Sequence, residues 1–174
     1  MKGDAIARPW TLFTSMFLHG SVSHLLFNMY VLFIFGSLLE SRIGTKRFLL
    51  LYFSSGLIAS VGSSMVYPAA LGASGAIMGV MGAIMVLIPG LKVLFFFIIP
   101  MPIWIAGIIF AIIDLFGVFN PAGTANVAHL VGLACGLIYA YHLKKKRKKF
   151  QKKFSRQHHL NDSDIEEYIR SGKI

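Results

Sequence analysis

The chain has 174 residues, of which 56% are hydrophobic and only 14% are charged. Ordinary soluble domains carry roughly 25% charged residues, so this composition excludes both a typical soluble domain and a disordered chain. The net charge of +10 comes mainly from the basic run between Lys144 and Lys153, whereas Phe48–Leu143 contains only Lys92 and Asp114 as charged side chains. A long uncharged segment followed by a basic run is typical of a polytopic membrane protein with a cytoplasmic tail.

Five apolar segments predict an all-α membrane bundle with five transmembrane helices. Most of the segments approach the roughly 20 residues that are needed to cross a bilayer. In chain order, the expected helices are Val22–Leu39, Arg47–Val66, Ser74–Ile88, Lys92–Asp114 and Val127–Leu143. Pro100 and Pro102 should kink or interrupt the fourth helix. Residues 1–143 then form a transmembrane domain, and residues 144–174 form a basic tail with a short amphipathic helix at 161–170.

The distribution of positive charge predicts the orientation. Arg42, Lys46 and Arg47 lie between the first two helices, Lys92 lies between the third and fourth, and the basic run follows the fifth. Loops rich in Lys and Arg stay in the cytoplasm. We therefore expect a multi-pass protein of a prokaryotic plasma membrane with a cytoplasmic C-terminus. The basic run is expected to contact anionic lipids, and no nucleic-acid partner is expected.

Four polar side chains are expected at a similar depth in the membrane. At about 1.5 Å per residue, Ser74 and His129 each lie about 22 Å above the cytoplasmic ends of their helices. By the same measure, His24 lies about 24 Å and Asn28 about 18 Å above the end of the first helix. Polar groups inside a bilayer are costly and are therefore functional candidates.

Together these residue types indicate acyl-transfer chemistry. A serine becomes a nucleophile when a base takes its proton, and His129 is the histidine at the depth of Ser74 on another helix. His24 and Asn28 are four residues apart, on one helix face, and can supply donors to an oxyanion. The N–H of Ser74 is a third candidate donor, because helix N-termini leave N–H groups without intrahelical partners.

Two faces of small residues predict that the third and fifth helices pack closely, which would bring Ser74 to His129. The faces consist of Gly75, Gly79 and Ala83 on one helix and of Gly132, Gly136 and Ala140 on the other.

The ordered set of motifs resembles the rhomboid family of intramembrane serine proteases. The matching segments are Arg8–Trp10, His19–Asn28, Glu40–Gly44, Gly72–Gly75 and Ala128–Gly136. The resemblance implies that Ser74 is the nucleophile and His129 the general base, in a dyad without an aspartate. It also implies cleavage of single-span transmembrane proteins near their external ends, and a water-filled cavity that opens to the outside.

The resemblance also assigns the neighbouring residues. His24 and Asn28 would help to form the oxyanion hole, and Gly72 and Gly75 would belong to the oxyanion and substrate-binding site. His19 either orders the external side of the site or simply lies at the interface. The helix at 92–114 and the loop after it would form a lateral gate for the substrate.

Alternative hypotheses remain open at this point. The family core has six helices, and this sequence begins seven residues before Arg8, so the first helix is expected to be missing. A rhomboid-like protein that binds transmembrane segments without cleaving them is therefore one alternative. Asp114 is either an ion or proton site or a wet or hydrogen-bonded residue near the external end of its helix, and with Lys92 it motivates a small transporter as the other. No His-Glu-x-x-His motif is present, and we expect neither a metal nor a cofactor.

Overall fold

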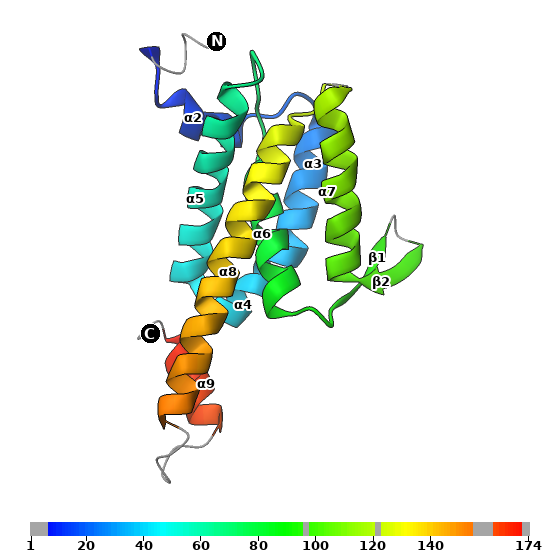
Figure 1. Cartoon of the computed structure of the whole chain (residues 1–174). Helices are drawn as coiled ribbons and strands as arrows, with labels where there is room; N and C mark the ends of the chain where they lie inside the picture. The colour runs from blue at the N-terminus through cyan, green and yellow to red at the C-terminus, as the bar shows by residue number, and fades with distance from the viewer. Residues whose placement is uncertain (1–6, 96–97, 121–122, 155–161, 172–174) are drawn as a thin grey trace.

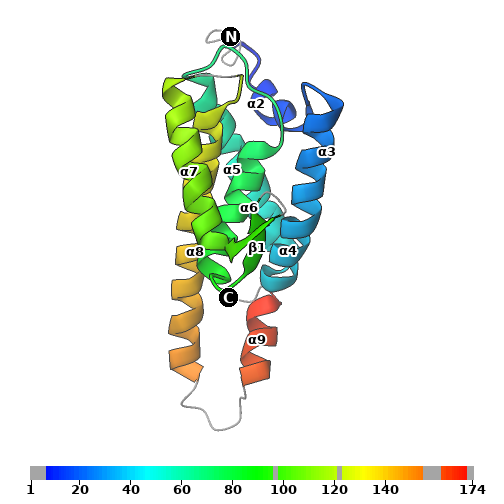
Figure 2. The same cartoon turned by 90° about the vertical axis from the view of Figure 1, so that its right-hand side faces the viewer.

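Helix α6 (Ser74–Leu87) lies at the centre of a helical bundle in the computed structural model, which describes residues 7–95, 98–120, 123–154 and 162–171 (Figure 1). All residues from Gly75 to Ile84 are buried. Helix α6 packs most extensively against α8 (Asn126–Phe154) and also against α5 (Thr45–Ser64). Figure 2 shows α3 and α7 on different sides of α6. Ser74 is therefore at the end of the best-packed helix of the bundle.

The remaining elements surround this central helix. They are α2 (Thr11–Thr14), a 3₁₀ turn at Ser15–Phe17, α3 (Val22–Val31), a π-helical turn at Leu32–Gly36, α4 (Ser37–Ile43), strands β1 (Lys92–Phe95) and β2 (Ile99–Pro102), α7 (Ile103–Phe119) and α9 (Asp162–Arg170). The expected amphipathic helix at 161–170 is confirmed as α9, except that Asn161 lies outside the described residues.

The two small-residue faces meet as expected. A Cβ atom built on Gly132 would collide with the carbonyl oxygen of Gly75, and one built on Gly136 would collide with that of Gly79. Ala83 and Ala140 are both fully buried farther along the same helices. Helices α6 and α8 thus approach until backbone touches backbone, which only glycine permits at these positions.

The expected helix at 92–114 is wrong in its first half. Residues Lys92–Phe95 and Ile99–Pro102 form an antiparallel hairpin, with Lys92 opposite Pro102 and Phe95 opposite Ile99. Proline has no N–H to donate within a helix, and it disfavours helical dihedral angles in the residue before it. Pro100 and Pro102 therefore exclude a helix here, and α7 begins directly after Pro102.

Three other predicted boundaries are also wrong. The fourth expected helix does not end at Asp114, because α7 continues to Phe119. The first expected helix does not end at Leu39, because the chain stays helical to Ile43 and turns at Gly44, where φ is +82°. The last expected helix does not end at Leu143, because α8 continues to Phe154. Lys and Arg are good helix formers, so the basic run extends the helix. The Lys144 ammonium also donates to the Val86 carbonyl oxygen at 3.1 Å.

Length and mean hydropathy identify two helical segments of the described chain that can cross a membrane, Val22–Ile43 and Asn126–Gln151. The apolar helices α6 and α7 are shorter, with 14 and 17 residues. The expected total of five transmembrane helices is therefore not confirmed. Large apolar side chains are nevertheless exposed along α3, the π-helical turn after it and α7, among them Phe27, Phe33, Ile112, Phe116 and Phe119. Exposed apolar surface of this extent indicates contact with a membrane or a partner.

Candidate active site

Ser74 is the first residue of α6 and follows directly after a sharp turn of the chain. Gly72 has a φ of +114°, which a residue with a side chain rarely adopts, and its N–H donates to the Ser15 carbonyl oxygen at 2.9 Å. Ala73 then caps the helix without a side-chain hydrogen bond. Ser74 consequently lies at the positive end of a helix dipole, where the first N–H groups have no intrahelical acceptor.

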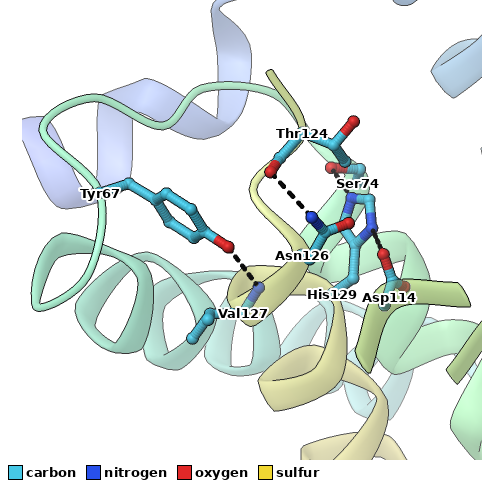
Figure 3. Close-up of polar contacts among 7 residues, drawn as sticks. All are labelled: Tyr67, Ser74, Asp114, Thr124, Asn126, Val127 and His129. Carbon is cyan, nitrogen blue, oxygen red and sulfur yellow. Dashed lines mark hydrogen bonds and ion pairs between the residues drawn. The ribbon is translucent and has the colours of Figure 1, made fainter. Parts of the chain in front are cut away.

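His129 lies in the first turn of α8 and faces Ser74. Its Nε2 is 2.8 Å from Ser74 Oγ, although the two residues are 55 positions apart in the sequence (Figure 3). The contact between Gly75 and Gly132 brings the two backbones together close to this pair. Both side chains are half-buried. A serine hydroxyl that hydrogen-bonds to an imidazole nitrogen has the geometry of a nucleophile next to its base.

Asp114 lies on the other side of the imidazole ring. Its Oδ1 is 2.9 Å from His129 Nδ1, and the carboxylate side chain is only 8% exposed (Figure 3). The expectation that Asp114 is hydrogen-bonded is confirmed, but sequence reasoning did not identify His129 as the partner. The family resemblance implied a dyad without an aspartate, whereas here a carboxylate contacts the imidazole on the side away from Ser74. The available signal was that a carboxylate in an apolar helix needs a partner. Sequence spacing alone does not say which partner it finds.

His24 and Asn28 lie beside the turn that precedes Ser74. A Cβ atom on Gly72 would lie 2.8 Å from His24 Cε1 and 3.8 Å from Asn28 Nδ2. Asn28 is buried, and its Nδ2 has no hydrogen-bond partner among the described residues. Ser21 caps α3 by accepting a hydrogen bond from the His24 N–H at 3.1 Å, which fixes the start of this helix. An unpartnered amide donor therefore lies next to the serine-bearing turn.

The other two candidate residues have different surroundings. The ring of His19 packs edge-on against His24 with 5.0 Å between the centroids, and its Nε2 is buried without a partner among the described residues. Gly75 is buried against Ala59 and Ala128, and a Cβ there would lie 2.8 Å from the Cβ of Ala59. His19 is thus adjacent to the site, and Gly75 permits the close packing beneath Ser74.

A small cavity of about 20 Å³ adjoins Ser74. Its lining includes Ser60 and Ser63 of α5 and Leu71 and Gly72 of the turn before Ser74. Ser63 Oγ is buried without a hydrogen-bond partner among the described residues. A cavity of about 10–15 Å³ with polar partners is sufficient for one water molecule, so this cavity can hold water next to the serine.

Within the described part of the chain, no group of three or more His, Cys, Asp or Glu side chains is arranged to hold a metal ion.

Comparison with known proteins places these residues in one family. A family model described as "Rhomboid domain" matches residues 7–146. The rhomboid protease GluP of Bacillus subtilis is 35% identical over 133 residues, which cover 75% of this chain and 25% of GluP. The mitochondrial rhomboid protein 1 of Saccharomyces cerevisiae is 31% identical over 83% of this chain and 45% of its own length. The mitochondrial RHOMBOID-like protein 6 of Arabidopsis thaliana is 41% identical over 44% of this chain and 25% of its own length. The chain spans less than half the length of these relatives.

Proposed function

Because the chain belongs to the rhomboid family, whose members are integral membrane proteins and include serine proteases, we propose that it is an intramembrane serine endopeptidase. Ser74 is the nucleophile and His129 is the general base. The observation that carries the proposal is the 2.8 Å contact between Ser74 Oγ and His129 Nε2. This contact joins the starts of two helices whose glycine faces are in backbone contact.

The proposed reaction has two halves. In the first, Ser74 Oγ attacks the carbonyl carbon of a peptide bond while its proton moves to His129 Nε2. The Nε2–H then protonates the leaving amide nitrogen, the C–N bond breaks, and an acyl-enzyme remains on Ser74. In the second, a water molecule gives a proton to Nε2 and attacks the ester, and the acid product leaves as Ser74 recovers its proton. The cavity beside Ser74 is a source for this water.

Charge on the carbonyl oxygen needs donors in the transition state. Asn28 Nδ2 is the best-supported donor, because it is buried, unpartnered among the described residues, and close to the Gly72 turn. His24 and the Ser74 N–H complete the proposed oxyanion site, and Gly72 and Gly75 form its floor. Removing one such donor typically lowers kcat by about 10²–10³-fold.

The proposed substrates are single-span transmembrane proteins that are cleaved near the external surface. The site lies at the end of the bundle where α3, α6 and α8 begin, whereas the basic run of α8 lies at the opposite end (Figure 1). Basic segments stay in the cytoplasm and favour anionic lipids, so the site is on the external side. Exposed apolar side chains of α7, such as Ile112 and Phe116, offer a surface for an approaching transmembrane segment.

The test uses the full chain in liposomes with a single-span peptide as substrate. The peptide carries a fluorophore on one side of the expected cleavage position, near its external end, and a quencher on the other side. Ser74→Ala and His129→Ala should each lower the cleavage rate by about 10⁴-fold or more. Ser64→Ala and His142→Ala are matched controls, because among the described residues each side chain hydrogen-bonds to a backbone carbonyl of its own helix.

Labelling by a fluorophosphonate probe gives a second measurement. The wild-type chain should be labelled on Ser74, and the label should disappear in Ser74→Ala. Cleavage that survives in Ser74→Ala would overturn the proposal. Absence of both cleavage and labelling in the wild-type chain, with binding of the peptide retained, would instead indicate a rhomboid-like protein that binds transmembrane segments.

A further inference from the structure

Asp114 is a buried ionisable group that the Ser74–His129 pair does not account for. It projects from α7 and contacts Nδ1 of His129, the ring nitrogen that faces away from Ser74 (Figure 3). Its side chain is 8% exposed, and that of His129 is 18% exposed. Burying a carboxylate is costly unless it is hydrogen-bonded, so this contact satisfies a group that would otherwise destabilise the fold.

The contact also determines the state of the imidazole. A neutral histidine carries one N–H and one lone pair, and the hydrogen bond at one nitrogen decides which nitrogen holds the proton. An ionised carboxylate only accepts hydrogen bonds. With Asp114 ionised, Nδ1 carries the proton and donates a hydrogen bond to Asp114 Oδ1, which leaves the lone pair of Nε2 directed at the Ser74 hydroxyl.

Helices α7 and α8, which carry Asp114 and His129, also contact each other one turn away, where Gly117 packs against Asn126. Gly117 is three residues after Asp114 on α7, and Asn126 is three residues before His129 on α8, so each pair shares a helix face. A Cβ on Gly117 would lie 2.5 Å from Asn126 Nδ2. Asn126 is buried and donates to the Thr124 carbonyl oxygen at 3.2 Å. The Val127 N–H also donates to the Tyr67 hydroxyl at 3.4 Å, which fixes the start of α8 (Figure 3).

We propose that Asp114 is a positioning residue that holds His129 in the Nδ1–H tautomer and orients Nε2 toward Ser74. The inference rests on the proposed protease function. When the Ser74 proton moves to Nε2, the imidazole becomes a cation, and the ionised carboxylate of Asp114 stabilises it without taking a proton. The Nδ1–H stays on Nδ1 throughout, and the proton on Nε2 passes to the leaving nitrogen. The catalytic unit is then a serine–histidine–aspartate triad.

Asp114→Asn tests this role with little change in shape. The asparagine NH₂ can donate a hydrogen bond to Nδ1 of His129, and this favours the opposite tautomer with the proton on Nε2. A protonated Nε2 of the neutral imidazole cannot accept the serine proton. We expect kcat to fall by about 10²–10⁴-fold, with KM little changed because the Asp114 side chain is buried against Nδ1 of His129. Asn120→Ala is the matched control, since Asn120 is an exposed polar residue at the end of the same helix whose side chain, among the described residues, bonds to the Phe116 carbonyl oxygen.

A structural role alone would not change the tautomer, so the second readout is ¹⁵N NMR of the full chain labelled at histidine. The signal that disappears in His129→Ala identifies His129. We expect Nδ1 to be protonated in the wild type and Nε2 in Asp114→Asn. Asp114→Glu, which keeps a carboxylate, should retain the wild-type tautomer and more activity than Asp114→Asn.

Each outcome decides the proposal. A wild-type His129 that is protonated on Nε2 would overturn it, even if Asp114→Asn fails to fold. Wild-type kcat in Asp114→Asn would also overturn it, while loss of cleavage in Ser74→Ala would leave the protease function standing. Cleavage that survives in Ser74→Ala would instead overturn the protease function on which the inference rests. The NMR measurement of the His129 tautomer does not depend on that result, so the two failures can be distinguished.

Discussion

Replacing Gly132 with alanine is the most direct way to separate Ser74 from His129 without touching either residue. Gly132 lies three residues after His129, on the face of α8 that meets α6. A Cβ there would collide with the carbonyl oxygen of Gly75 and would lie 2.9 Å from its carbonyl carbon. Carbon atoms in contact prefer about 3.5–4.0 Å, so the two helices must separate by about 1 Å at this level.

This separation is large compared with the tolerance of the reaction. The distance between Ser74 Oγ and His129 Nε2 is 2.8 Å, and a shift of about 1 Å would exceed the usual limit of about 3.2 Å for a hydrogen bond. A misplacement of about 1 Å can cost about 100-fold in rate. Overpacking a dense interface lowers the free energy of unfolding by about 1–3 kcal/mol. We therefore expect Gly132→Ala to lower kcat/KM by about 100-fold and to be measurably less stable.

The assay is peptide cleavage in liposomes together with thermal unfolding of the purified chain. Gly136→Ala is the informative comparison, because its Cβ would collide equally with the Gly79 carbonyl oxygen but one turn farther from the site. We expect Gly136→Ala to lose about as much stability as Gly132→Ala but less cleavage activity. Gly90→Ala is the neutral control, since a Cβ at that position would meet no atom of the described residues within 4 Å, apart from its chain neighbours. Wild-type cleavage and stability in Gly132→Ala would refute the argument that backbone contact brings the two residues together.

Two further predictions concern the surroundings of Ser74. Asn28→Ala should lower kcat by about 10²–10³-fold with little change in KM, because it removes a donor from the proposed oxyanion site, and unchanged kcat would exclude Asn28 from that site. Ser63→Val should fill the cavity of about 20 Å³ and exclude water from it, so that acyl-enzyme accumulates and the first product is released in a burst. A linear time course in Ser63→Val at the wild-type rate would show that the water comes from elsewhere.

The sequence alone was sufficient for features that depend on local spacing. Helices α5 and α6 begin and end within two residues of the expected positions, because long apolar segments bounded by turn residues determine them. The glycine and alanine spacing of α6 and α8 predicted their contact, since a repeat of four residues places small side chains on one helix face. The similar depths of Ser74 and His129 could be predicted because each residue lies about the same number of helical residues above the cytoplasmic end of its helix.

The sequence did not determine features that depend on distant contacts. The segment at 92–102 is as apolar as a membrane helix, and the pairing of Lys92 with Pro102 that makes it a hairpin is not visible in its periodicity. Nor does hydropathy show that the basic residues after Leu143 continue α8, because the loss of apolar residues marks the end of a membrane span and not the end of a helix.

The division is clearest at the imidazole of His129. Helical spacing places this residue at the depth of Ser74, and the glycine faces bring the two helices together. The packing of α7 against α8 decides which ring nitrogen faces Ser74. The same packing decides which side chain contacts the other ring nitrogen. The sequence therefore determined that a serine and a histidine would meet, whereas only the tertiary structure placed Asp114 on the far side of the ring.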